Sequence, residues 1–334
     1  MVLAVDIGGT KVAAGLVAAD GSLSAHRVVP TSGGTAECAW QPVAQMVREV
    51  HACVGERRLV GVGVGSAGPL DLAAGTVSPV NIPAWRGFPL RDRLAALVPG
   101  VPVHLAGDGA CAAAGEHWHG AGRGADDLLV IVVSTGVGGG LVQRGRLVTG
   151  PSGNAGHIGH TVVDVDGDPC PCGGRGCVEA IASGPQMVAW AVRQGWSPGV
   201  GGASSDGTPP GGTLWGGASL AVVSAAVLAA AARTGDAVAR QAFDRAGRAL
   251  AAGAVSAAAL CDLSRVVVGG GVARAADLLF PPLRTALAGY AHLDFLRGLT
   301  VRRAALGTAA GLVGAAALVF APDRYPVTTA TDRR

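Results

Sequence analysis

The chain carries little charge for its length. Asp, Glu, Lys and Arg make up 15% of the 334 residues, the formal net charge is +3, and no run of basic residues occurs. Nucleic acids and anionic membrane surfaces attract such runs, so the sequence predicts neither kind of partner. Lysine is almost missing, since Lys11 is the only one. That single lysine lies in a glycine-rich turn.

The sequence predicts neither a secretory signal nor a membrane helix. Its first residues contain no basic region and reach Asp6 early, unlike the start of a secreted precursor. One long uncharged stretch, residues 304–321, is mostly weakly apolar Ala and Gly, whereas a membrane helix needs about 20 predominantly apolar residues. We therefore predict a buried C-terminal helix at 304–321 and a tail at 322–334.

Cysteine is sparse and mostly scattered. The chain has seven, an odd number, and four of them stand singly: Cys38, Cys53, Cys111 and Cys261. Scattered thiols are typical of proteins in a reducing compartment. The sequence therefore predicts a cytoplasmic protein.

The other three cysteines lie close together. Cys170, Cys172 and Cys177 follow the segment Gly156–His160. Three thiolates and one imidazole form the closed tetrahedral set of a structural zinc site, and thiolates favour zinc over Mg²⁺ or Ca²⁺. A disulfide or a chance group of thiols is the alternative. The predicted metal ligands are His160, Cys170, Cys172 and Cys177.

Glycine, in contrast, is abundant and forms turns after short apolar runs. Residues 2–7 and 12–18 flank the turn Asp6–Lys11, and residues 128–133 lead into Ser134–Gly140. Each unit is predicted to be a β-hairpin. The return of the same unit more than a hundred residues later indicates a duplicated α/β fold. A Rossmann dinucleotide-binding turn leads into a helix, whereas neither of these turns does, so the sequence does not predict a Rossmann fold.

Such turns bring backbone N–H groups against phosphates. In the first turn, Asp6 would suit Mg²⁺ or its water shell. A third glycine run, Gly269–Gly271, follows the apolar residues 266–268. Ordinary hairpin turns are the alternative. The predicted nucleotide-binding residues are Asp6, Gly8, Gly9, Thr10, Lys11, Ser134, Thr135, Gly136, Gly138, Gly139, Gly269, Gly270 and Gly271.

The remaining pattern predicts two lobes around a cleft. We expect a small N-terminal lobe over residues 1–117 and a large lobe over 118–303, with the helix at 304–321 packing back on the N-terminal lobe. Residues 195–218 are rich in Gly, Ser and Pro without periodicity, which predicts a surface loop or disorder. Further expected elements are strands at 60–64 and 101–106 and helices at 40–54, 110–119, 183–194, 219–233 and 236–261.

Asp108 stands between an expected strand and an expected helix. An aspartate in this place can cap the helix, because its carboxylate accepts N–H groups that lack a partner. A functional role in the cleft is the alternative. The two roles are compatible, and the sequence leaves both open.

These motifs resemble the ROK sugar kinases, which have the hexokinase-like, ribonuclease H-like fold of the actin-like ATPases. The resemblance runs from Val2 to about Ala321, over motifs at 6–11, 134–140, 156–160, 170–179 and 269–271. It implies ATP and Mg²⁺ as cofactors, a homodimer, and Asp108 as the catalytic base toward the 6-hydroxyl of a sugar. Regulators of the family carry a DNA-binding segment before the first turn, and because this turn begins at residue 6 we expect no such segment here.

The resemblance also implies a sugar pocket whose loop the zinc site holds in place. Two departures bear on the sugar: Gly107 replaces the family's usual asparagine, and His157 replaces its usual glutamate. A histidine can donate to a hydroxyl or an acetyl carbonyl, whereas an ionised glutamate only accepts. With its neighbours, His157 resembles the bacterial N-acetylmannosamine kinases. The predicted substrate-binding residues are Gly68, Asn81, Asp108, His157, His160 and Glu179.

Other segments favour glucose. Gly65–Asp71 and Pro79–Trp85 resemble the glucokinase branch, in which Asn81 would contact the sugar, although Asn81 also suits a plain turn. His157 is alternatively a second metal ligand or a packing residue. N-acetylmannosamine is therefore the first predicted acceptor, and glucose or N-acetylglucosamine the second. A non-catalytic sugar-sensing regulator is the alternative outside the enzymes.

Overall fold

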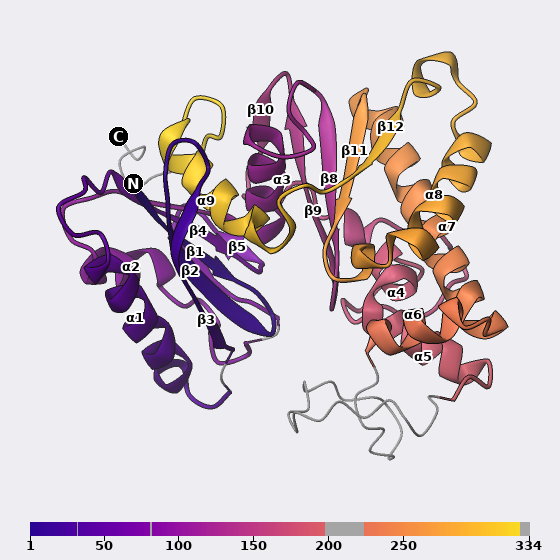
Figure 1. Ribbon diagram of the computed structural model, residues 1–334, viewed down its shortest axis with the longest axis horizontal. Helices are drawn as coiled ribbons and strands as arrows, with labels where there is room; N and C mark the ends of the chain where they lie inside the picture. Colours follow the sequence, from indigo (N-terminus) through magenta and orange to yellow (C-terminus); the bar gives the residue numbers. More distant parts are fainter. Residues whose placement is uncertain (32, 81, 198–223, 328–334) are drawn as a thin grey trace.

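The computed structural model describes residues 1–31, 33–80, 82–197 and 224–327. Two five-stranded sheets form its framework, and the helices α3 (Asp108–Trp118) and α9 (Ala310–Phe320) lie between them (Figure 1). The expected α/β fold with two lobes is confirmed. Asn81, residues 198–218 of the Gly-, Ser- and Pro-rich segment and residues 328–334 of the expected tail lie outside the described residues.

The first sheet has the strand order β3-β2-β1-β4-β7. Its first three strands are antiparallel, whereas β4 and β7 continue the sheet in parallel. These strands are β1 (Val2–Ile7), β2 (Lys11–Val17), β3 (Leu23–Pro30), β4 (Gly61–Ser66) and β7 (Val103–Gly107). The first lobe also contains α1 (Ala36–Ala52), α2 (Leu90–Leu97) and the short hairpin of β5 (Leu70–Asp71) and β6 (Thr76–Val77).

The second sheet repeats this order and these directions as β10-β9-β8-β11-β12. Its strands are β8 (Leu128–Val133), β9 (Val137–Gln143), β10 (Arg146–Val148), β11 (Arg265–Gly269) and β12 (Thr300–Arg303). The helices of the second lobe are α4 (Val178–Ala182), α5 (Gly184–Arg193), α6 (Ala225–Arg233), α7 (Ala237–Cys261) and α8 (Ala276–Tyr290). Single 3-10 turns are η1 (Ile158–His160), η2 (Val272–Arg274), η3 (Asp294–Leu296) and η4 (Gly307–Ala309). The duplicated hairpins predicted from the glycine turns are therefore present.

The helices α3 and α9 lie in close contact because both carry glycine where they meet. A Cβ on Gly314 would lie 1.6 Å from the Cys111 carbonyl oxygen, and one on Gly115 would lie 2.4 Å from the Ala310 oxygen. The Ala- and Gly-rich composition of the C-terminal segment thus serves close packing. Its helix begins at Ala310, later than the expected residue 304, because the 3-10 turn η4 precedes it.

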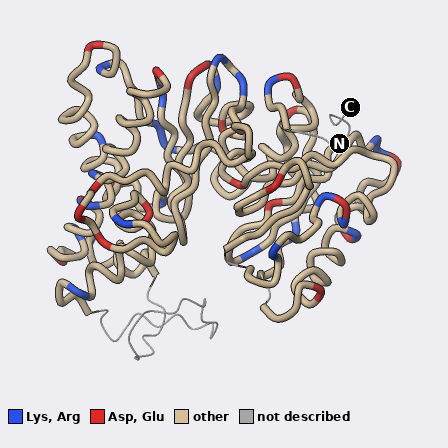
Figure 2. The backbone as a smooth tube through the Cα atoms, turned by 180° about the vertical axis from the view of Figure 1, so that it is seen from behind, with Lys and Arg blue, Asp and Glu red and all other residues tan. Residues whose placement is uncertain are grey.

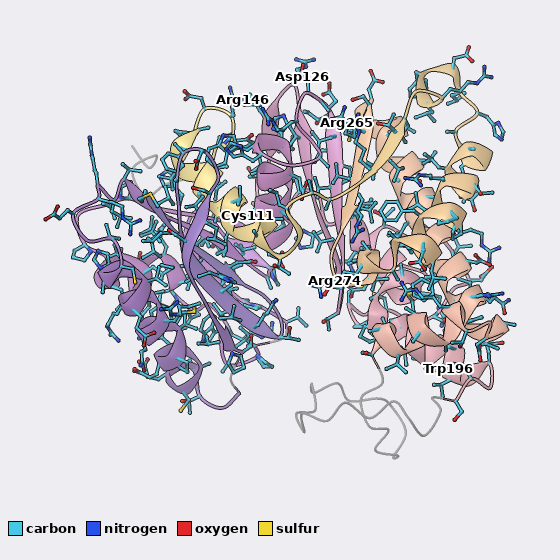
Figure 3. The ribbon with its side chains drawn as sticks, in the orientation of Figure 1. Cys111, Asp126, Arg146, Trp196, Arg265 and Arg274 are labelled. Carbon is cyan, nitrogen blue, oxygen red and sulfur yellow. The ribbon has the colours of Figure 1, made fainter. Side chains whose placement is uncertain are left out.

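Apolar side chains fill three large buried clusters (Figure 3). One lies between α1 and the first sheet, one among the helices of the second lobe, and one around α3 and α9 between the sheets. Acidic and basic residues are interspersed along both lobes (Figure 2). Among the described residues, no helix has both the length and the apolar character that crossing a membrane requires.

Candidate active site

Asp108 lies where β7 joins α3, between the two lobes. Gly107 is the N-cap of α3 and Asp108 is its first helical residue, so Asp108 is not at the N-cap position, although its carboxylate binds an N–H of the first turn. Its Oδ1 accepts the Gly109 N–H at 2.7 Å. Solvent reaches the side chain, but protein surrounds it on most sides, and this desolvation raises the pKa of the carboxyl against the effects of the Gly109 hydrogen bond and of His157.

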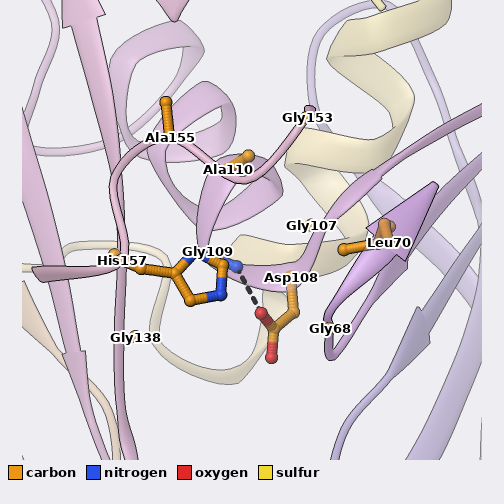
Figure 4. Close-up of a pocket in the computed structure, with 11 residues that line it drawn as sticks. Gly68, Leu70, Gly107, Asp108, Gly109, Ala110, Gly138, Gly153, Ala155 and His157 are labelled. Atoms are coloured by element: carbon orange, nitrogen blue, oxygen red, sulfur yellow. Dashed lines mark hydrogen bonds between the residues drawn. The ribbon is translucent and has the colours of Figure 1, made fainter. Parts of the chain in front are cut away.

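A small pocket in front of Asp108 receives residues from both lobes (Figure 4). The pocket brings together predicted residues from four motifs: Gly68, Asp108 with its neighbours, Gly138 with Gly139, and His157. It also contains Leu70, Gly153 and Ala155, for which the sequence offered no signal beyond their closeness to those motifs. The full lining consists of Gly68, Leu70, Gly107, Asp108, Gly109, Ala110, Gly138, Gly139, Gly153, Ala155 and His157.

The His157 ring points toward Asp108 across this pocket (Figure 4). Its Nδ1 lies 2.9 Å from the Asn154 carbonyl oxygen. Because a carbonyl oxygen only accepts, Nδ1 carries a proton. The remaining Nε2 is then an acceptor in the neutral ring and a donor in the charged ring. His157 does not belong to the group of ligand atoms formed by His160 and the cysteines.

Asp6 is the second-last residue of β1 and lies beside the first turn of α9. A Cβ on Gly311 would lie 2.3 Å from Asp6 Oδ2, so glycine makes room for this carboxylate. Burial, reinforced by the negative charge of Asp108, raises the pKa of Asp6 to about 7, while Lys11 acts in the opposite direction. Two carboxylates that repel each other fit a divalent cation such as Mg²⁺, which favours oxygen ligands and offsets their charge.

The first glycine turn presents its polar side chains outward. Gly8 N–H donates to the Lys11 oxygen at 3.0 Å, and Thr31 N–H donates to the Thr10 oxygen at 3.0 Å. These bonds fix the turn, while Thr10 and Lys11 remain exposed and Gly8 and Gly9 are partly exposed. The turn therefore has donors available for an anionic ligand.

The second and third glycine runs meet at the carboxyl ends of the neighbouring parallel strands β8 and β11. Gly270 has φ +92°, and a Cβ on it would lie 2.3 Å from the Val133 oxygen, so only glycine fits. A Cβ on Gly271 would lie 3.6 Å from Ser134 Oγ. Thr135 and Ser134 are exposed beside this contact. Gly139, in contrast, is buried, and a Cβ on it would lie 2.7 Å from the Val130 oxygen and 3.0 Å from the Gly156 oxygen, so it makes room for β8 and for the loop before η1.

Glu179 lies under the second glycine turn. Its Oε2 accepts the Val137 N–H at 2.8 Å, and a Cβ on Gly136 would lie 2.7 Å from the same oxygen. Glu179 is in the first turn of α4, two residues after Cys177, which is the N-cap of this helix. It is not among the residues that line the pocket of Asp108. The carboxylate thus links the cysteine loop to the glycine turn.

The four predicted metal ligands lie together. His160 Nδ1 lies 4.0 Å from Cys170 Sγ, Cys172 Sγ lies 3.9 Å from Cys177 Sγ, and all four ligand atoms lie within 4.8 Å of one another. The thiols are free, so the disulfide alternative is wrong. Zinc–sulfur bonds of about 2.3 Å place two thiolates of a tetrahedron roughly 3.8 Å apart. The donor set and its spacing therefore fit a zinc ion.

Known proteins share this architecture over nearly the whole chain. The model of the ROK family matches residues 2–321. The chain belongs to the ROK family. The glucokinase of Thermotoga maritima is 36% identical to this ROK protein over 327 residues, which cover 95% of this chain and 96% of that protein. The N-acetylmannosamine kinase of Shigella flexneri is 36% identical over 279 residues, covering 83% and 85%.

A solved structure agrees with these relatives. The ROK family glucokinase from Streptomyces griseus, in complex with glucose and AMPPNP, is 35% identical to this chain and matches its structure with a TM-score of 0.79. The match covers 95% of this chain and 98% of that one. The expected fold and the expected kind of enzyme, a ROK sugar kinase, are confirmed.

Proposed function

We propose that this ROK sugar kinase transfers the γ-phosphoryl group of ATP to the 6-hydroxyl of N-acetylmannosamine. The observation that carries the proposal is the placement of His157 and Asp108 on facing sides of one pocket (Figure 4). Asp108 supplies the chemistry common to the family, and His157 supplies the preference for an N-acyl sugar.

Asp108 acts as the general base. Because Gly109 N–H holds Oδ1, Oδ2 accepts the proton of the 6-hydroxyl while the sugar oxygen bonds to the γ-phosphorus. The bond from that phosphorus to the β–γ bridging oxygen breaks, and ADP leaves. The transition state of such transfers is loose, so positioning and charge stabilisation supply most of the acceleration.

The glycine turns hold the nucleotide. Thr10 and Lys11 donate to its phosphates from the first turn, and the backbone of the two glycine runs at the second sheet receives the other side of the tail. Mg²⁺, held near Asp6, would neutralise charge on the phosphates.

The preference for an N-acyl sugar follows from the hydrogen-bonding capacity of His157. With Nδ1 bound to the Asn154 oxygen, a neutral ring accepts the acetamido N–H at Nε2, and a charged ring donates to the acetyl oxygen. A glutamate in this place would repel that oxygen, since a carboxylate only accepts. Gly107 adds room, because a side chain there would project to within 3.8 Å of Leu70 Cδ1.

Glucose is the second candidate acceptor. The specific observation in its favour is the full-length similarity to proteins named glucokinase, one of them solved with glucose and an ATP analogue. A homodimer and a cytoplasmic location, implied by the resemblance and the scattered thiols, belong to the same proposal.

A coupled ADP-release assay with N-acetylmannosamine, glucose and N-acetylglucosamine tests the acceptor. We expect kcat/KM for N-acetylmannosamine to exceed that for glucose by at least about tenfold, as one unmatched polar contact allows. His157→Glu should reverse this order, whereas His26→Gln, a change at an exposed site in the first lobe, should preserve it. Preference of the wild-type protein for glucose would refute the acceptor assignment.

The structural zinc is proposed from the same loop. We expect one zinc per chain by elemental analysis and its loss in Cys177→Ala, while Cys38→Ala, at an exposed isolated thiol, keeps it. Because Glu179 follows Cys177 and binds the Val137 N–H, zinc removal should also speed amide exchange in the second glycine turn. Full occupancy in Cys177→Ala would contradict the assignment.

A further inference from the structure

One side chain joins the two lobes next to residues that line the pocket of Asp108. Asn154, in the loop after β10, exchanges two hydrogen bonds with the backbone of Leu70, which belongs to the β5–β6 hairpin of the other lobe. Leu70 N–H donates to Asn154 Oδ1 at 3.2 Å, and Asn154 Nδ2 donates to the Leu70 oxygen at 3.2 Å. The residues are 84 positions apart in sequence.

This pairing fixes the orientation of the amide. Rotating the amide by half a turn would set Nδ2 against the Leu70 N–H and Oδ1 against the Leu70 oxygen, so that neither pair could bond. The second Nδ2 hydrogen has its own acceptor, the Ser152 oxygen at 2.9 Å. The Asn154 side chain is therefore matched to the backbone of the opposite lobe in the same way as a strand is matched to its neighbour.

The loop around Asn154 supports this contact. Gly153 has φ +81°, and a Cβ on it would lie 2.5 Å from both Cδ1 and Cγ of Leu72, so the loop backbone rests directly on the hairpin. The Asn154 carbonyl oxygen in turn receives His157 Nδ1 at 2.9 Å. Asn154 thus contacts both the β5–β6 hairpin and His157, so the place of the hairpin and the orientation of the His157 ring depend on the same residue.

We propose that Asn154 is an interlobe latch: its side chain holds the two lobes closed over the sugar, and its carbonyl oxygen sets the His157 ring at the same time. Asn154 is a positioning residue, because it acts through Leu70 and His157. Both Leu70 and His157 line the pocket. A sugar that enters must therefore separate these two residues, and the latch must open. Bonds at 3.2 Å lie at the long end of the N–H···O range, and Asn154 is only half-buried, as a contact that opens in each catalytic cycle requires.

The test compares Asn154→Ala and Asn154→Asp with the wild-type protein. The alanine loses both bonds to Leu70, and the aspartate, which has nearly the same shape, sets a carboxylate oxygen against the Leu70 oxygen. We expect the sugar KM of both variants to rise about tenfold, the effect of losing two hydrogen bonds of ordinary strength, with a much smaller change in kcat. Ser152→Ala, which removes only a 3.4 Å contact to the same amide, should keep the wild-type sugar KM.

Two further measurements separate a latch from a merely structural contact. Amide exchange at Leu70 should be fast in Asn154→Ala, and small-angle scattering should give a larger radius of gyration for this variant without sugar. A sugar KM within twofold of the wild-type value, or unchanged exchange at Leu70, would overturn the latch. If the alanine variant fails to fold, the near-isosteric aspartate variant decides.

The latch rests on the sugar-kinase activity and not on the choice of N-acetylmannosamine. The assay therefore uses whichever sugar the wild-type protein phosphorylates. Turnover of glucose alone would refute the proposed acceptor and leave the latch to be decided by the variants.

Discussion

The two carboxylate oxygens of Asp108 have different surroundings. Oδ1 is bound to the Gly109 N–H, whereas Oδ2 has no donor within the described residues. An asparagine in this place keeps an oxygen for Gly109 and loses the basic site. The exchange of Asp108 for asparagine therefore separates catalysis from local structure.

We expect Asp108→Asn to lower kcat by about 10²- to 10⁴-fold, the usual contribution of a general base, with little change in the melting temperature. The wild-type base must be ionised to work. Because burial raises its pKa above the ordinary 3.8, the acid limb of the kcat profile should lie above that pH and disappear in the variant. Asp20→Asn, at an exposed turn, is the matched control. A kcat of Asp108→Asn within threefold of the wild-type value would show that Asp108 is not the general base.

The single lysine allows a direct test of the first glycine turn. An amine-selective reagent can modify only Lys11 and the amino group of Met1, which lies at the other end of β1. If Lys11 contacts the phosphates, MgATP should protect Lys11 and leave Met1 reactive, as read by peptide mass spectrometry. Sugar alone should protect neither amine. Equal labelling of Lys11 with and without MgATP would place the triphosphate elsewhere.

Single residues were predictable where a short motif defines them. Asp108, His157 and Gly68 meet in one pocket as their motifs indicated. Glu179 was expected in the sugar pocket, yet its carboxylate binds the Val137 N–H, a contact set by how α4 packs. Asn154 had no signal, because its partner Leu70 is distant in sequence and offers only backbone atoms.

Among the elements, α3 and the segment after α9 are joined by a buried histidine. Arg324 Nη2 lies 3.3 Å from His117 Nε2, and Tyr325 Oη lies 3.1 Å from His117 Nδ1. Since arginine only donates, Nε2 is the acceptor and Nδ1 carries the single proton of a neutral ring. Protonation would set a second N–H against the guanidinium of Arg324.

This contact predicts a loss of stability in acid. Burial, with the charge of Arg324, lowers the pKa of His117 from its ordinary value of 6.5 to about 4. Between these values the unfolded chain binds a proton that the native protein does not, so the free energy of unfolding falls as pH drops from 6.5 to 4. His117→Gln should be less stable at neutral pH but lose less on acidification, as followed by melting temperature. His26→Gln, at an exposed site, should follow the wild-type slope; a slope for His117→Gln equal to wild type would contradict the assignment.

The kinds of elements were more predictable than their ends. The hairpins followed from alternating apolar runs and glycine turns, because both signals are local. The start of α3 at Asp108 was missed by two residues, since Gly107 caps the helix without a side chain. The start of α9 was missed by six, since Ala and Gly continue through η4 and mark no boundary.

For the whole molecule, the cluster between the sheets is where the two lobes share one core. It contains residues of β1, β8 and β11 together with α3 and α9. The sequence indicated two lobes through the repeated hairpins, but the glycine contacts that let α9 reach α3 depend on the folded arrangement. Where α3 and α9 meet, backbone atoms contact backbone atoms, so no side chain could change its conformation to accommodate a larger residue.

Gly314→Ala tests this shared core. Its Cβ would lie 1.6 Å from the Cys111 oxygen and 2.9 Å from the Gly115 nitrogen, so α9 must move away from α3. We expect the free energy of unfolding to fall by about 1–3 kcal/mol or more, the usual effect of overpacking, seen in the melting temperature and in urea titration. Gly289→Ala in α8 is the matched control, because nothing lies within 4 Å of its Cβ and alanine in a helix favours folding by roughly 0.4–1 kcal/mol. Equal stability of the two variants would mean that α9 packs more loosely on α3 than these contacts require, and that the lobes are not joined through this core.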